Sequence, residues 1–122
     1  MNVKKCVKCG ALVEVIKDCT CDDCGIKCCG EQMVDVVANS VEASIEKHKP
    51  QIRINGDVVE AVVPHVMDDD HYIEWMGIEG DGIYAKINFE PGQKAKAMFP
   101  YVKGSKIFAY CNLHGLWETE IK

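Results

Sequence analysis

Seven of the eight cysteines of this chain lie between Cys6 and Cys29, and the eighth is Cys111. A segment of about 35 residues cannot bury a sufficient hydrophobic core, so thiols at this density indicate that metal or disulfides hold the segment together. The remaining stretch, of about 85 residues, is long enough to bury a core of its own. We therefore expect two domains, residues 1–36 and residues 37–122.

The overall charge and hydropathy exclude several classes of partner. A net charge of −5 and a pI of about 5.3 leave no basic surface of the kind that binds nucleic acid. No apolar run approaches the ~18 residues of a transmembrane helix, and the first residues lack the apolar stretch of a signal peptide. These features predict a cytoplasmic protein with no membrane or nucleic-acid partner, and in that compartment thiols bind metal more often than they form disulfides.

Turn signals in the second segment predict β structure. Asn55-Gly56 separates two short β-prone runs, which is a strong hairpin signal. The turn 80–82 separates residues 72–78 from residues 83–89, and a further run, 106–110, leads into Cys111. Short strands with turns at such spacing are typical of a small antiparallel sandwich, so we expect a mostly β chain. Only residues 40–47 could hold a helical turn, and we give that helix little weight.

All four histidines lie beside loop or turn residues, and one of them follows Cys111 closely. They are His48, His65, His71 and His114. A lone histidine in a β domain is usually a surface or core residue, but four imidazoles with one thiolate form a mixed set that suits a redox-active first-row metal. A closed structural zinc site needs only four ligands. Five donors on a six-coordinate metal leave one position open for a substrate.

Several short segments carry a family resemblance. EKHKP (46–50), VPHVM (63–67), HYIEW (71–75) and YCNLHGLW (110–117) resemble the corresponding segments of superoxide reductases. Together with CVKCG and KCCGEQM near the N-terminus, they resemble the two-iron desulfoferrodoxin subgroup. The likeness spans nearly the whole chain. Val66 and Tyr72 stand where the family often has proline and tryptophan, and neither change removes a ligand.

The resemblance implies a fold and an activity. The fold is a small rubredoxin- or desulforedoxin-like metal knuckle followed by an immunoglobulin-like antiparallel β-sandwich. The activity is superoxide reductase, the one-electron reduction of superoxide to hydrogen peroxide without production of dioxygen. The implied partners are superoxide, an electron donor such as rubredoxin, and a second copy of the chain in a homodimer.

The same resemblance assigns the catalytic residues. The iron is held by His48, His65, His71, Cys111 and His114. Lys47 attracts the anion and orders a water that delivers the proton, and Glu46 occupies the sixth position of the oxidised resting state. Backbone N–H groups around residues 112–114 are placed to tune the Cys111 sulfur.

The N-terminal thiols allow two metal-binding sets. The resemblance assigns iron, or zinc, to Cys6, Cys9, Cys28 and Cys29, although 18 residues separate Cys9 from Cys28. A rival set joins Cys6 and Cys9 to Cys21 and Cys24 with zinc-ribbon spacing. The intervening thiols Cys19, Cys21 and Cys24 are otherwise idle, or form a labile disulfide, or recruit zinc.

Three alternatives belong to other functional classes. A cupredoxin-like electron carrier would use two histidines, a cysteine and an axial methionine, but no methionine follows His114. A non-catalytic zinc adaptor would leave the five-donor set unexplained. A redox or metal sensor would act through the extra cysteines, and turnover measurements would separate it from an enzyme.

Overall fold

The computed structural model describes residues 1–22 and 25–122. Contacts divide the chain into an N-terminal unit, Met1–Val37, and a C-terminal unit, Ala38–Lys122. Among the described residues, no helix combines the length and the apolar character needed to cross a membrane.

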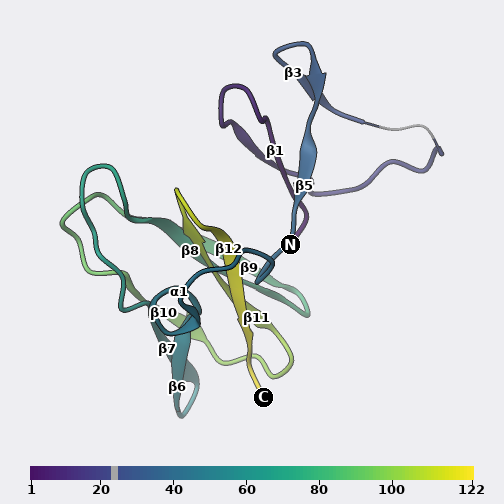
Figure 1. Ribbon diagram of the computed structural model, residues 1–122. Helices are drawn as coiled ribbons and strands as arrows, with labels where there is room; N and C mark the ends of the chain where they lie inside the picture. The colour runs from purple at the N-terminus through teal and green to yellow at the C-terminus, as the bar shows by residue number, and fades with distance from the viewer. Residues whose placement is uncertain (23–24) are drawn as a thin grey trace. The chain divides into compact units, whose positions relative to one another are not determined.

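Two antiparallel sheets build the C-terminal unit (Figure 1). One sheet has the order β10-β7-β6, with β6 at Gln51–Asn55, β7 at Val58–Val62 and β10 at Lys96–Pro100. The other has the order β12-β11-β8-β9, with β8 at Ile73–Gly80, β9 at Ile83–Asn88, β11 at Lys106–Cys111 and β12 at Gly115–Glu120. The prediction of a mostly β, antiparallel sandwich is therefore confirmed.

The hydrophobic core lies between these two sheets. Val59 and Ala61 of β7 form one buried cluster with Met76 and Ile78 of β8 and with Ile107 of β11. Because side chains alternate across a strand, each of these strands turns every second residue into the core. Cys111, at the end of β11, belongs to the same cluster and is completely buried. The core thus anchors one of the predicted metal ligands directly.

The secondary-structure predictions were accurate at the hairpins and incomplete elsewhere. The hairpin predicted at Asn55-Gly56 forms, with Asn55 at the end of β6 opposite Val58 and Gly56 in the turn at a positive φ of 63°. Strands β10 and β12 had no assigned prediction. The helix to which we gave little weight does form, as the single turn α1 at Ile45–His48.

The N-terminal unit has a three-stranded sheet and a two-stranded hairpin. The sheet has the order β2-β1-β5, with β1 at Val3–Lys5, β2 at Leu12–Glu14 and β5 at Val34–Val36. The hairpin pairs β3, Lys27–Cys28, with β4, Glu31–Gln32. Cys29 and Gly30 form its turn with φ values of 54° and 77°, and two positive φ values suit the tight hairpin turn that matches strand twist.

Candidate metal centre

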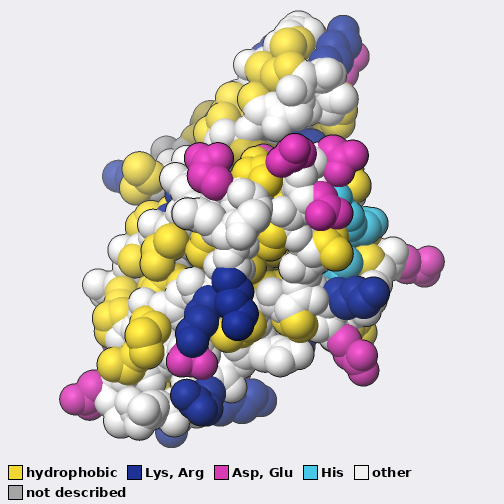
Figure 2. Space-filling view, turned by 90° about the vertical axis from the view of Figure 1, so that its left-hand side faces the viewer, with side chains coloured by type: hydrophobic (Ala, Val, Ile, Leu, Met, Phe, Trp, Pro, Cys, Tyr) yellow, Lys and Arg dark blue, Asp and Glu magenta, His cyan; other side chains and the backbone are white. Residues whose placement is uncertain are grey.

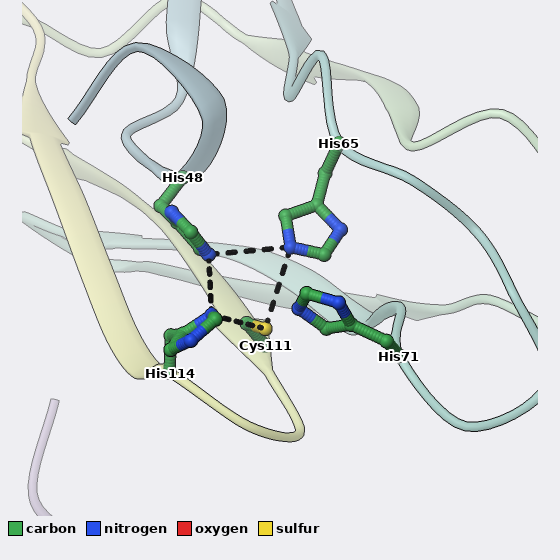
Figure 3. A group of neighbouring side chains, drawn as sticks. All are labelled: His48, His65, His71, Cys111 and His114. Carbon is green, nitrogen blue, oxygen red and sulfur yellow. Dashed lines mark hydrogen bonds between the residues drawn. The ribbon is translucent and has the colours of Figure 1, made fainter. Parts of the chain in front are cut away.

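Five predicted ligands meet at one end of the sandwich (Figure 3). His48 ends α1, His65 and His71 lie in the connection from β7 to β8, and Cys111 and His114 flank the turn from β11 to β12. One donor atom from each residue lies within 4.8 Å of all the others. Part of the histidine cluster is visible at the surface of the molecule (Figure 2).

The β11–β12 turn holds two of the five donors. The pairing of β11 with β8 shifts register between Tyr110 and Cys111, which then faces Ile73. A bulge of this kind re-aims a side chain at a strand end. Gly115 closes the turn with a φ of 80°, a backbone conformation that glycine adopts without strain.

The connection from β7 to β8 is fixed by its own backbone bonds. The N–H of His65 donates to the carbonyl of Val63 at 2.8 Å, directly after Pro64. Asp68 and His71 exchange two backbone hydrogen bonds of 3.0 and 3.3 Å. These short turns hold the two imidazoles in place, with ring centroids 4.5 Å apart and planes at 89°.

Two carbonyl groups set the tautomers of the imidazoles that face each other. His48 Nδ1 lies 2.7 Å from the carbonyl oxygen of Ser44, and His65 Nδ1 lies 2.5 Å from that of Val66. A carbonyl only accepts, so each Nδ1 carries the hydrogen and each Nε2 carries a lone pair. The two Nε2 atoms nevertheless lie 3.2 Å apart. Two lone pairs at that distance repel each other, and a cation between them removes the repulsion.

A third imidazole also indicates a bound cation. Nε2 of His71 is buried and has no hydrogen-bond partner. A buried polar atom without a partner costs about 1–3 kcal/mol, and ligation to a metal would satisfy it. His114 Nδ1 lies 3.0 Å from His48 Nε2 and 3.8 Å from the Cys111 sulfur. The donor set therefore fits a metal ion of mixed nitrogen and sulfur preference.

Burial disfavours the charged forms of two of the imidazoles and of the thiol. Burial lowers the pKa of His48 and of His65. Burial raises the pKa of the Cys111 thiol, while backbone N–H groups of Leu113 and His114 act in the opposite direction. These N–H groups lie within the 112–114 stretch in which the sequence predicted donors to the sulfur. They stabilise the thiolate that a metal needs.

Glu46 and Lys47 lie on α1, immediately before His48. Both side chains are exposed to solvent, whereas His48 is buried. The single helical turn thus places one side chain inward as a donor and two charged groups outward. They are not among the five donors that meet in Figure 3.

A second cluster of donors lies in the N-terminal unit. The thiols of Cys6, Cys9, Cys28 and Cys29 lie within 4.8 Å of one another. Contact with the thiol of Cys6 raises the pKa of Cys28, and the backbone N–H of Cys9 lowers the pKa of Cys6. Thiols at this spacing resist joint ionisation, and a central cation stabilises the thiolates. The arrangement fits a tetrahedral four-thiolate site.

The cysteines of the loop between Cys9 and Cys28 differ in whether they are bonded. Cys19 is disulfide-bonded, and Cys21 is an exposed thiol. Cys24, which completes the rival zinc set, lies outside the described residues. Cys19 is therefore not an idle thiol.

Comparison with known proteins decides the family. The family model described as Desulfoferrodoxin matches residues 40–120. The chain belongs to the desulfoferrodoxin family. The desulfoferrodoxin of Syntrophotalea carbinolica is 37% identical to it, and the match covers 98% of this chain and 96% of that protein.

Two further relatives carry another name. The superoxide reductase of Thermococcus kodakarensis is 33% identical, over 62% of this desulfoferrodoxin-family chain and 86% of that protein. The crystal structure of the superoxide reductase from Treponema pallidum matches with a TM-score of 0.71 at 21% identity, covering 97% of this chain and 98% of that one. This second likeness concerns the fold.

Several residues that contact the donor side chains were not predicted from the sequence. Trp117 stacks on the ring of His48, with centroids 5.1 Å apart and planes at 24°. The Asn112 side chain accepts from the N–H of Tyr72 at 3.0 Å and donates to the carbonyl of Asp70 at 2.9 Å. Both residues lie inside the segment YCNLHGLW, so their closeness in sequence to Cys111 and His114 could have identified them. Ser44 and Val66 act through their backbone carbonyl groups, which residue type does not reveal.

Proposed function

We propose that this chain is a superoxide reductase, an enzyme that reduces superoxide to hydrogen peroxide at a mononuclear iron held by His48, His65, His71, Cys111 and His114. The observation that carries the proposal is the pair of lone pairs 3.2 Å apart on His48 and His65, beside the partnerless nitrogen of His71. Five such donors leave one coordination position for a small ligand. Iron held by these residues would supply the one electron that, with two protons, converts superoxide to hydrogen peroxide without dioxygen.

Cys111 tunes this centre from inside the protein. Its sulfur is completely buried, so water cannot compete for it. The N–H groups of Leu113 and His114 stabilise its negative charge. A thiolate at this position would donate electron density to the bound metal and so tune its reactivity.

Lys47 and Glu46 assist from the solvent side. In a protein of net charge −5, superoxide gains little from long-range attraction, so the exposed ammonium of Lys47 provides a local one. We assign it the attraction of the anion and the ordering of a proton-delivering water. Glu46 is assigned as the carboxylate that closes the open position in the oxidised enzyme.

The N-terminal unit completes the proposed assembly. We assign residues 1–36 to a desulforedoxin-like domain that binds iron, or zinc, through Cys6, Cys9, Cys28 and Cys29, and residues 37–122 to the catalytic domain. Four thiols within 4.8 Å support this assignment over the zinc-ribbon set. The proposal includes a cytoplasmic homodimer that receives electrons from a donor such as rubredoxin.

Metal analysis combined with turnover tests the proposal. Protein from iron-replete cells should carry iron in the C-terminal unit and should consume superoxide with release of hydrogen peroxide but no dioxygen. Dioxygen evolution would indicate dismutation instead. Zinc or copper with no iron, and no activity after iron reconstitution, would reject the enzyme.

No observation favours a second function. The cupredoxin-like alternative needs two histidines with a methionine, whereas the donor group found among the described residues holds four histidines. A zinc adaptor has no use for a fifth donor.

A further inference from the structure

A hollow of about 400 Å³ lies beside α1, outside the five-donor group. It is lined by Asn39, Val41, Glu42, Ala43, Ile45, Lys49 and Trp117. Its size lies within the range of small-molecule sites, which are mostly apolar with a few polar groups. None of these residues is one of the five donors, and none is assigned a contact with superoxide.

The outer wall of the hollow is anchored to the sheet. The backbone N–H of Asn39 donates to the carbonyl of Leu116 at 2.9 Å, and its side chain makes two further bonds, of 2.9 and 3.3 Å, with the backbone of Glu118. Val41 packs close to Gly115, where an added Cβ would lie 3.4 Å from it. The segment that follows residue 38 is therefore held against β12, so the hollow is built into the fold.

Apolar side chains at the hollow remain open to solvent. Val41 is 41% exposed and Ile45 is 64% exposed. Solvent contact of this kind is unfavourable, and a flat apolar ligand between them would remove part of it. Lys49 contributes a positive charge and Glu42 a negative one at the same hollow.

Trp117 connects this hollow with the metal centre. It lines the hollow, and its ring stacks on His48 with centroids 5.1 Å apart. Its indole N–H donates to the carbonyl of His114 at 3.1 Å. One aromatic side chain thus contacts two of the five donor residues and reaches a site that solvent can enter.

We propose that the hollow is an electron-entry site for a planar aromatic donor, a reduced flavin. The ring lies between Val41 and Ile45, and Lys49 neutralises the anionic form of the reduced ring. Trp117 and His48 form the path to the metal. The inference rests on the proposed function, because it supplies the electron that each reduction of superoxide consumes.

The electron balance of the step is simple. The anionic reduced flavin loses one electron to become a neutral radical, and the oxidised metal ion gains that electron. In a later turnover the radical gives up its second electron and releases a proton to solvent, which leaves the oxidised flavin. No covalent bond to the protein forms or breaks, and Trp117 stays in its ordinary state because the electron tunnels across the stacked rings.

Binding is tested without any redox reaction. Riboflavin is titrated into zinc-loaded protein, with its fluorescence and the methyl NMR signals of Val41 and Ile45 as readouts. Ile45→Glu places a charge against the apolar ring and should weaken binding about tenfold or more. Ile54→Glu is the matched control, because Ile54 is 46% exposed on β6 and should leave affinity unchanged. Equal affinity in both variants, or shifts away from the hollow, would overturn the inference.

Electron delivery is tested separately in the iron-loaded protein. Reduced riboflavin should reduce the Ile45→Glu variant about tenfold more slowly than the parent or the Ile54→Glu control. The parent protein and the Ile54→Glu control, each reduced beforehand by dithionite, should react with superoxide at the same rate. Unchanged reduction by riboflavin would refute the entry site. If the parent protein, reduced beforehand, does not react with superoxide, the proposed function is refuted. Riboflavin binding to the zinc form would still decide whether the hollow binds a flavin.

Discussion

Asn112 and Tyr72 are joined by two hydrogen bonds between the loops that carry the metal donors. The N–H of Tyr72 donates to Oδ1 of Asn112 at 3.0 Å, and the N–H of Asn112 donates to the carbonyl of Tyr72 at 3.2 Å. Tyr72 follows His71, and Asn112 follows Cys111. The pair therefore fixes the distance between two donors that are far apart in the sequence.

Replacing Asn112 with alanine tests this connection. Asn112→Ala loses the bonds to Tyr72 and Asp70 that its side chain makes, and should lower the free energy of unfolding by about 1–2 kcal/mol. Metal affinity should fall roughly 10–100-fold, as is usual when a partner of the ligands is removed. Competition with a chelator measures the affinity. The same change at Asn55, in the distant hairpin, should leave affinity unaltered.

Replacing Cys111 with serine should separate folding from chemistry. The side chain is completely buried, and serine is similar in size, so the sandwich should remain folded. The iron form should lose its thiolate-to-iron absorption band and its superoxide reductase activity. Persistence of both band and activity would show that the ligand assignment is wrong.

The metal-free protein should lose stability on acidification. Burial lowers the folded-state pKa of His48 and His65 below the 6.5 of an unfolded chain, so the unfolded state binds more protons. The stabilising contribution is complete above pH 6.5 and declines as the pH falls through 6.5 toward the folded-state pKa values. Urea unfolding followed by tryptophan fluorescence reports the C-terminal unit, because both tryptophans lie there.

His48→Gln provides the control for this pH dependence. Glutamine does not titrate, so the slope of stability against pH should become shallower in that variant. A free energy of unfolding that stays constant or rises between about pH 7 and pH 5 in the parent protein would contradict the expected sign.

Lys47→Ala should slow the capture of superoxide. The loss of a local positive charge should reduce the second-order rate about 3–10-fold at low salt and weaken its salt dependence. Iron content should stay the same, because Lys47 is exposed and outside the donor group. Pulse radiolysis at two ionic strengths measures the rate. Lys47→Arg should retain the attraction, and Lys94→Ala serves as an exposed control.

The two possible sets of N-terminal metal ligands predict different effects of mutation on metal content. Cys28→Ser should abolish the N-terminal metal, because Cys28 lies 3.6 Å from Cys9 in the four-thiol cluster. Cys21→Ser should keep it. Elemental analysis of both variants decides the question, and the reverse result would favour the zinc-ribbon set.

Local sequence signals predicted the hairpins well and two strands poorly. Gly56 adopts the positive φ of the turn without strain, so the prediction of this hairpin needed no tertiary information. Strand β10 begins at Lys96 and ends at Pro100, and those residues argue against a strand when viewed alone. It forms because Ala97 and Phe99 are buried in the core opposite β7. Strand β12 likewise depends on its pairing with β11.

The donor residues were predictable, whereas the groups that orient them were not. Histidine and cysteine indicate metal chemistry by residue type, and the family resemblance assigned five of them to one site, where the structure brings them together. The tautomers of His48 and His65 depend on carbonyl groups of Ser44 and Val66. Every residue has a carbonyl group, so only the folded backbone reveals which one accepts. The stacking of Trp117 on His48 was hidden for the same reason, because β12 brings the two together.

The two units should differ in how far their folding depends on a bound metal. In the C-terminal unit the core is assembled from strands of both sheets, and Cys111 is the one metal donor that belongs to it. In the N-terminal unit, the described apolar residues that are buried are Val3, Cys6 and Met33, and one of these is itself a donor. In a cell that runs short of iron, we expect the C-terminal unit to stay folded and able to bind metal later, whereas the N-terminal unit should unfold and be the first to be degraded by proteases.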